Sequence, residues 1–302
     1  MSDALLNRLA ALKKERNAVI LAHNYQRGEV QDAADITGDS LELARKAAKT
    51  DADVILFCGV HFMAETAAII SPKKTVVMPD PNAGCPMANM ITPRELKKVL
   101  AEHPGAYVVT YVNSTAAIKA MSDICCTSSN AVKIVSQAPR EREIVFIPDW
   151  SLGEYTAEKS GRGLVLYPGY CPTHHRILPD DIRKARREHP DANIAVHPEC
   201  VREVRELSDF VGSTSQIIKY CNETNVLEFV IGTEIGILHK IRKDNPRKKF
   251  YPASELADCP NMKLATLEKM VWALEDMETV ITVPPPVADK ARLAIERMLA
   301  LA

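Results

Sequence analysis

The sequence repeats itself at an interval of about 86 residues. The segment PRELKKVLAEHPGAYVV, which starts at Pro93, aligns with PDDIRKARREHPDANIAV, which starts at Pro179. A helical pattern followed by an apolar strand pattern also fills residues 5–25, so the same pair recurs at 93–113 and 179–199. Because a repeat of this length is one supersecondary unit, the chain is expected to fold as three similar units.

Each repeat continues with further apolar strands between helix-forming segments. They read DVILF and KTVVM in the first repeat, EIVFI and LVLY in the second, and LEFVI and KKFY in the third. Nearly continuous apolar strands that alternate with helices indicate buried parallel sheets, and therefore an α/β fold with approximate threefold symmetry. The predicted boundaries are 1–91, 92–178 and 179–283, with a C-terminal packing helix in 284–302 from Ala288 to about Leu301.

The composition is that of a globular protein with a substantial core. Of the 302 residues, 46% are hydrophobic, and 38 Lys and Arg residues balance 39 Asp and Glu residues. This balance gives no dominant basic surface, so we expect no nucleic acid and no membrane among the partners. No signal-peptide pattern opens the chain, and no segment reaches the roughly 20 apolar residues that span a bilayer. The predicted location is the cytoplasm.

The eight cysteines are expected to be thiols, metal ligands or catalytic groups, because disulfides are rare in a reducing compartment. No C-x-x-C pair occurs, which argues against a local zinc knuckle or a thioredoxin-type site. Five cysteines are interpreted as buried or structural residues: Cys58, Cys125, Cys126, Cys200 and Cys221.

The remaining cysteines follow the repeat. Cys85, Cys171 and Cys259 are separated by 86 and 88 residues, and each is followed by proline. Equivalent loops just beyond the third strand of each unit would bring the three thiolates together. Such a set suits zinc, copper or an iron–sulfur cluster. A cubane cluster is favoured because three thiolates leave one of its four irons open to substrate; a three-thiolate zinc site with an open water is the alternative.

Polar residues also recur where the first strand of each unit ends. The matched pairs are His23 and Tyr25, Tyr111 and Asn113, and His197 and Glu199. Ligands of open parallel sheets bind outside the carboxyl ends of the strands, so these residues are placed for chemistry.

Hydroxyl residues begin the next segment of each unit, at Asp39-Ser40, Ser128-Ser129 and Ser213-Thr214-Ser215. They are ordinary helix caps, but three such helix starts around one site would favour carboxylates and phosphate. The glycine-rich phosphate motifs are absent, which disfavours the usual modes of dinucleotide and ATP binding.

Short strings spread over the chain resemble the quinolinate synthase family. They occur in the family's order between about residues 18 and 283, and read AHNYQ, GDSLELA, GVHFMAET, YVNSTAAIKA, CTSSNAV, VHPEC, VGSTS, GTEIG and CPNMK. The resemblance implies three α/β units in a pseudo-threefold triangular arrangement around a central [4Fe-4S] cluster. It further implies a transferase of NAD biosynthesis that condenses iminoaspartate with dihydroxyacetone phosphate to quinolinate, with loss of phosphate and water. A functional link to the enzyme that supplies iminoaspartate follows.

The resemblance also assigns residues. The implied cluster ligands are Cys85, Cys171 and Cys259. The resemblance places Glu199, Tyr25 and Tyr111 in active-site motifs, and because the reaction needs proton transfers we expect Glu199 to be the general base and the two tyrosines to be acid–base or orienting groups. The implied substrate-binding residues are His23, Asp39, Ser40, Asn113, Ser128, His174, His197, Ser213 and Thr214. The segment PDWSLGEY departs from the family's usual form, in which asparagine commonly stands where Ser151 does, and no role is assigned to Ser151 or Asp149.

Two other functions share some of these features. An iron–sulfur hydro-lyase acting on a small hydroxy acid would use the same open iron with only one substrate. An iron or redox sensor would use the cluster as its signal, but it predicts no recessed ring of His, Tyr, Ser and Glu and usually brings a DNA-binding or partner surface.

Overall fold

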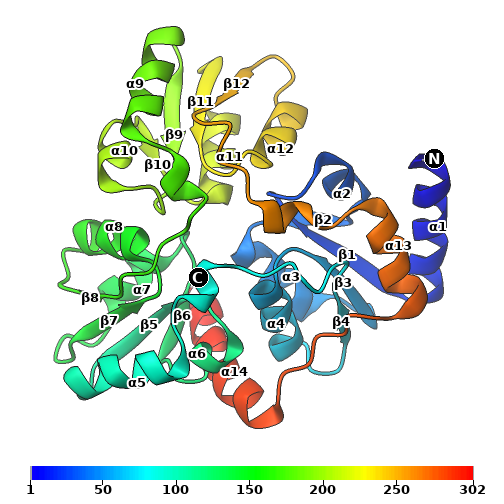
Figure 1. Ribbon diagram of the computed structural model, residues 1–302, viewed down its shortest axis with the longest axis horizontal. Coiled ribbons are helices and arrows are strands. Elements are labelled where there is room, and N and C mark those ends of the chain that lie inside the picture. The colour runs from blue at the N-terminus through cyan, green and yellow to red at the C-terminus, as the bar shows by residue number, and fades with distance from the viewer. Residues whose placement is uncertain (1, 302) are drawn as a thin grey trace. The chain divides into compact units, whose positions relative to one another are not determined.

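Three four-stranded sheets carry the fold, and all three have the same strand order in the computed structural model, which describes residues 2–301 (Figure 1). The orders are β2-β1-β3-β4, β6-β5-β7-β8 and β10-β9-β11-β12. The paired strands run parallel, as for β1 with β3, β5 with β7 and β9 with β11. The predicted α/β class with three repeated parallel-sheet units is therefore confirmed.

The elements also repeat one for one. The first repeat consists of α1 (Ser2–Glu15), β1 (Ala18–His23), α2 (Gly28–Ala33), β2 (Ile36–Gly38), α3 (Ser40–Lys49), β3 (Val54–Cys58), α4 (His61–Ile70), β4 (Thr75–Val77) and the 3-10 helix η1 (Met87–Asn89). The second consists of α5 (Pro93–Glu102), β5 (Tyr107–Tyr111), α6 (Ala116–Lys119), β6 (Ile124–Cys126), α7 (Ala131–Gln137), β7 (Ile144–Ile147), α8 (Trp150–Ser160), β8 (Val165–Leu166) and η2 (His174–Arg176).

The third repeat and the C-terminal segment complete the chain. The third consists of α9 (Pro179–Glu188), β9 (Asn193–Val196), α10 (Arg202–Glu206), β10 (Phe210–Val211), α11 (Thr214–Glu223), β11 (Glu228–Gly232), α12 (Ile237–Asp244), β12 (Lys249–Pro252) and η3 (Pro260–Lys263). Two helices follow, α13 (Leu267–Asp276) and α14 (Pro285–Leu301). The C-terminal helix starts three residues before the predicted Ala288, because proline fits the first turn of a helix.

The described chain divides into two compact units. Unit 1 contains the residues up to Asn89, Val112–Cys125, and those from Pro260 onward; unit 2 contains Met90–Tyr111 and Cys126–Cys259. The domain boundaries expected from the repeat stay predictions. Within residues 2–301, no helix is both long enough and apolar enough to cross a bilayer.

The core of unit 1 lies between the first sheet and the helices at both ends of the chain. Leu12 of α1, Ile20 of β1, Leu56 of β3 and Met270 of α13 are buried in one cluster. Figure 1 shows α1 beside α13, and α14 packs against α4 and α6. The C-terminal helices thus complete the hydrophobic cover of the first repeat.

The core of unit 2 includes an equivalent cluster on its third sheet. Ile182 of α9, Ile194 of β9, Val204 of α10 and Val230 of β11 are buried together. Because β9 and β11 are covered by helices, the residues that leave the sheet at their carboxyl ends start from fixed positions.

Candidate functional site

The same turn follows the first strand of the first and third repeats. In unit 1 the backbone N–H of Tyr25 donates to Nδ1 of His23 (3.2 Å). In unit 2 the backbone N–H of Glu199 donates to Nδ1 of His197 (3.3 Å). In both turns the residue two positions after the histidine is buried. The repeat detected in the sequence therefore extends to side-chain geometry, and Glu199 occupies the position that Tyr25 has in the first repeat.

Glu199 is the centre of a buried hydrogen-bond network in unit 2. The hydroxyl of Tyr111 donates to its Oε1 (2.5 Å), and Nδ1 of His174 lies 2.8 Å from its Oε2. Nε2 of His174 lies 2.8 Å from the hydroxyl of Thr233. Only 2% of the surface of Glu199 is exposed, so its charge depends on these partners rather than on water.

His197 joins this network to the second repeat. Its ring stacks on that of His174 with centroids 4.6 Å apart, and its Nε2 lies 3.2 Å from the hydroxyl of Ser128. Because its Nδ1 accepts the N–H of Glu199, Nε2 is the nitrogen that faces Ser128. Unit 2 therefore brings together five of the predicted residues: Tyr111, Ser128, His174, His197 and Glu199.

Two buried carboxyl groups of unit 2 have pKa values shifted in opposite directions. Burial alone would raise the pKa of Glu199, but the charge of His174 and hydrogen bonds from His174 and Tyr111 lower this pKa well below its usual range. Burial and the charge of Glu199 raise the pKa of Asp149 well above its usual range. The pKa values of these two carboxyl groups are thus shifted in opposite directions, a division that active sites use to separate an acid from a base.

Asp149 also fixes local structure. It is the N-cap of α8, where its Oδ1 accepts the N–H of Leu152 (2.6 Å). Its Oδ2 is buried without a hydrogen-bond partner in the described part of the chain. The neighbouring Ser151, where the sequence departs from the family's usual form, places its hydroxyl 3.0 Å from Nε2 of His175.

The three candidate cysteines occupy equivalent places. Cys85, Cys171 and Cys259 follow β4, β8 and β12 respectively, and each precedes or adjoins a 3-10 helix. The predicted position just beyond the third strand is thus the position after the fourth, because each sheet contains a short strand that the sequence pattern did not reveal. All three residues are partly exposed, whereas the other five cysteines are buried.

The buried thiols are poor ligands. Burial raises the pKa of Cys125 and of Cys221 to about 12, and it raises the pKa of Cys58 and Cys200 as well. Since the thiolate is the form that binds metal, these four thiols are disfavoured as ligands. This difference agrees with the choice of Cys85, Cys171 and Cys259, whose role as ligands stays a prediction.

Neighbouring residues hold two of these cysteines. Sγ of Cys171 lies 3.1 Å from Nδ1 of His174, the histidine that contacts Glu199. The backbone N–H of Cys259 donates to Oε1 of Glu234 (3.0 Å), and Oε2 of Glu234 accepts the N–H of Gly236 (2.8 Å). A buried glutamate therefore fixes the loop that presents Cys259.

The remaining predicted residues lie at helix starts or in unit 1. Asp39 is the N-cap of α3 and accepts the N–H groups of Leu41 and Glu42 (both 3.0 Å). Ser213 caps α11 in the same way, through the N–H of Gln216 (3.3 Å). Ser40 and Thr214 are the first residues of these two helices. His23, Tyr25, Asp39, Ser40, Cys85 and Asn113 belong to unit 1.

Ser128 and Ser129 do not begin a helix, in contrast to the hydroxyl residues of the other two repeats. The helix α7 starts at Ala131, because Oδ1 of Asn130 accepts the N–H of Thr127 (2.7 Å) and a turn precedes the helix. The expectation that Ser128 is a helix cap was wrong, and the turn instead directs its hydroxyl to His197.

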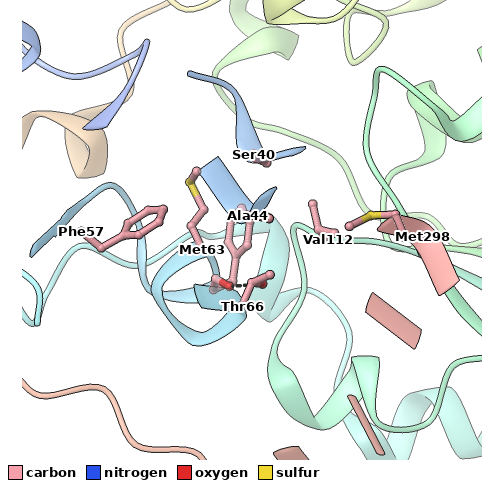
Figure 2. A pocket seen from close by; sticks show the side chains of 8 residues that line it. Ser40, Ala44, Phe57, Met63, Thr66, Val112 and Met298 are labelled. Carbon is pink, nitrogen blue, oxygen red and sulfur yellow. Dashed lines mark hydrogen bonds between the residues drawn. The ribbon is translucent and has the colours of Figure 1, made fainter. Parts of the chain in front are cut away.

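Ser40 also lines a small pocket in unit 1 (Figure 2). Most of the other lining residues are apolar, among them Phe57 of β3, Met63 of α4 and Met298 of α14. The volume in which the centre of a water molecule fits is about 10 Å³, so the pocket has room for about one water. The pocket is too small and too apolar to define an anion site.

Sequence reasoning missed Thr233, Glu234 and Arg205. Thr233 and Glu234 follow β11, so the rule that ligands meet the carboxyl ends of strands would have found them if applied to the third strand of the sheet. Arg205 is buried and donates to the carbonyl oxygens of Cys200 (2.7 Å) and Ser151 (3.1 Å). No sequence pattern signals this role, because it depends on tertiary contacts.

The chain is similar to known proteins over almost its whole length. The family described as Quinolinate synthetase A protein matches residues 7–300. A protein of Dehalococcoides mccartyi named quinolinate synthase is 54% identical over 297 residues, which are 98% of each chain. Proteins of the same name from Geobacter metallireducens and Thermodesulfovibrio yellowstonii are 52% and 50% identical, and the alignments cover 98% or more of each chain.

Proposed function

The chain belongs to the quinolinate synthase family, and we propose that it condenses iminoaspartate with dihydroxyacetone phosphate to quinolinate, releasing phosphate and water. The reaction joins two substrates and places the enzyme among the transferases of NAD biosynthesis. Iminoaspartate has to come from another enzyme, so a functional link to that enzyme forms part of the proposal. The observation that carries the chemistry is the buried, ionised Glu199 between Tyr111 and His174.

Glu199 is the proposed general base. It is ionised at neutral pH, so it is ready to accept a proton, and its ion pair with His174 holds it in one orientation. The hydroxyl of Tyr111 donates to it directly and offers a path by which a proton from a bound substrate reaches the carboxylate. The imidazoles of His174 and His197, together with the hydroxyl of Ser128, would bind the anionic oxygens of the substrates.

The cofactor is proposed to be a [4Fe-4S] cluster held by Cys85, Cys171 and Cys259. The donor set fits this group, since the three partly exposed thiols follow the same strand of three equivalent sheets while the other cysteines are buried. When bound, the cluster supplies an iron without a protein ligand, which acts as a Lewis acid toward a hydroxyl or carbonyl oxygen.

Cysteine variants test the ligand set. Cys85→Ser, Cys171→Ser and Cys259→Ser are each expected to lose the bound iron and sulfide and the synthesis of quinolinate, because thiolates are the ligands of such clusters. Protein purified without oxygen is assayed for visible absorption, iron, sulfide and quinolinate. The matched control is Cys221→Ala, which removes a buried thiol of α11 and should leave the iron and sulfide content unchanged.

A full complement of iron and sulfide in any of the three serine variants would contradict the proposed ligands. Release of phosphate separates the proposed reaction from a hydro-lyase. We expect quinolinate and phosphate only when both substrates are present; consumption of a single hydroxy acid with no phosphate release would indicate a hydro-lyase.

A further inference from the structure

Three different metal-binding side chains meet in unit 2. Sγ of Cys171, one ring nitrogen of His174 and one carboxylate oxygen of Glu199 all lie within 4.8 Å of one another. Nδ1 of His174 is between the other two, 3.1 Å from Sγ and 2.8 Å from Oε2. A thiolate, an imidazole and a carboxylate whose donor atoms converge form a typical ligand set for a mononuclear transition metal with an open fourth position.

Neighbouring side chains orient these ligands. The hydroxyl of Thr233 holds Nε2 of His174 (2.8 Å), which directs Nδ1 toward Cys171 and Glu199. The hydroxyl of Tyr111 holds Oε1 of Glu199 (2.5 Å), which directs Oε2 toward His174. Metal sites are built in this way, with the free atom of each ligand fixed by a second hydrogen bond.

Charge and size also suit a divalent ion. A thiolate and a carboxylate together neutralise the ion, so that burial beside His174 and Glu199, 3% and 2% exposed, is tolerable. The partly exposed Cys171 gives a side for entry. Ligand bonds of about 2.0–2.3 Å require Nδ1 of His174 to lie roughly half an ångström farther from Sγ and from Oε2, as the metal replaces the proton that His174 shares with Glu199.

We propose that the chain without its cluster binds a single zinc-like divalent ion at Cys171, His174 and Glu199. Sulfur, nitrogen and oxygen donors together favour Zn²⁺, Co²⁺ or Fe²⁺ over Mg²⁺ and Ca²⁺, which take oxygen ligands alone. One consequence rests on the proposed function: because Cys171 is also a proposed cluster ligand, the single ion and the cluster exclude each other.

Cobalt provides the direct test. Cluster-free protein, held anaerobically and reduced, is titrated with Co²⁺, and a thiolate-to-cobalt charge-transfer band is expected to saturate at one equivalent. Cys171→Ser should remove the band, while His174→Ala and Glu199→Gln should weaken Co²⁺ binding by roughly tenfold or more. Circular dichroism verifies that each variant is folded. Thr233→Val provides a milder change, since losing an orienting partner typically lowers metal affinity roughly tenfold to a hundredfold.

Cys85→Ser and Cys259→Ser are the matched controls. They remove equivalent thiols outside the proposed trio, so cobalt affinity and stoichiometry should not change. Loss of binding in either control would overturn the proposal in favour of a site made of three thiolates. Unchanged binding in Glu199→Gln and His174→Ala would also overturn it.

The exclusion is tested separately with Zn²⁺. Protein loaded with one equivalent of Zn²⁺ is expected to take up less iron and sulfide during cluster reconstitution than metal-free protein, and a chelator should restore the uptake. If cobalt binds as expected but zinc leaves reconstitution unaffected, the single-metal site stands and Cys171 is not shared with the cluster. The failure of the proposed cluster ligands is thereby distinguished from the failure of the metal site.

Discussion

Polar side chains just after the first strand of a repeat differ between the two compact units. In unit 2, Glu199 is paired with Tyr111 and His174, and both of its oxygens have partners. In unit 1, Oδ1 of Asn24 and Oδ1 of Asn113 are buried without a hydrogen-bond partner among the described residues. Asn24 directly follows β1, and Asn113 lies two residues after the end of β5.

Buried acceptors without a partner and a closed hydrogen-bond network suit different roles. A buried acceptor without a partner destabilises the folded chain by about 1–3 kcal/mol, so such atoms persist where a ligand or water completes them. A closed network, in contrast, holds its groups in one protonation state before anything binds. We therefore expect the network around Glu199 to be set before a ligand binds, and Oδ1 of Asn24 and Oδ1 of Asn113 to accept a hydrogen bond from a ligand or water.

The buried cations show the same contrast. Arg205 of unit 2 pairs with Glu154 (2.8 Å). Lys119 of unit 1 is fully buried, donates to the carbonyl oxygen of Ser114 (2.6 Å) and lies 5.4 Å from the centre of the Phe62 ring. One cation is neutralised by a carboxylate and the other is held by a carbonyl group and a ring, which leaves its charge less compensated.

The largest effect is expected at the preset network. Glu199→Gln keeps the shape of the side chain but removes the proton acceptor, so turnover should fall by about a hundredfold or more, with iron content and substrate binding retained. Steady-state kinetics and iron analysis measure this. Glu203→Gln, an exposed change on α10, is the control and should behave like the unmodified protein. Near-normal turnover in Glu199→Gln would assign the base to another residue, with Tyr111 the next candidate.

A smaller effect is expected in unit 1. Asn113→Ala removes an Oδ1 acceptor that has no partner among residues 2–301, so KM should rise roughly tenfold while the melting temperature stays the same or increases. The reason is that the substrate would lose a hydrogen bond to Oδ1, whereas the unliganded chain loses no bond to this atom. Thermal unfolding and kinetics on the same preparation separate the two quantities. A lowered melting temperature with unchanged KM would mean that Asn113 has a structural role and that its Oδ1 does not bind the substrate.

Most of the fold could be predicted because the same pattern of helices and strands occurs in three repeats. The strands β1, β3, β5, β7, β9 and β11 are nearly continuous apolar runs, which are typical of the buried strands of a parallel sheet. The strands β2, β6 and β10 could not be predicted, since two or three residues are too few for a periodic pattern.

The sequence predicted the positions of several candidate residues but not the electrostatics around them. Glu199 and Tyr111 follow from their positions at strand ends, and the structure joins them by a hydrogen bond. The sequence contains no sign that the pKa of Glu199 is lowered while that of Asp149 is raised, because both are carboxyl groups and only their surroundings differ. Thr233 was missed for the same reason, as its contact with His174 joins residues of different elements.

The smallest predicted effect concerns Lys119 and its response to pH. Burial lowers the pKa of Lys119 below its usual value, with Glu65 opposing this effect. Between the lowered pKa of the folded chain and the ordinary pKa near 10.4, the unfolded chain binds a proton at this side chain that the folded chain does not. Stability therefore rises with pH through this window, because deprotonation relieves the buried charge.

Lys119→Met removes this dependence. The substitution takes away the titrating group and also leaves the carbonyl oxygen of Ser114 without its donor, which adds a cost that is the same at every pH. Urea unfolding of both proteins from neutral pH to about pH 10 measures the difference, which should change in favour of the unmodified protein by on the order of 1 kcal/mol per unit of lowered pKa. Lys219→Met, at an exposed position on α11, is the control and should not alter the pH dependence. If the curves of the unmodified protein and Lys119→Met run parallel, the charge of Lys119 is compensated in the folded state, and the contrast with Arg205 disappears.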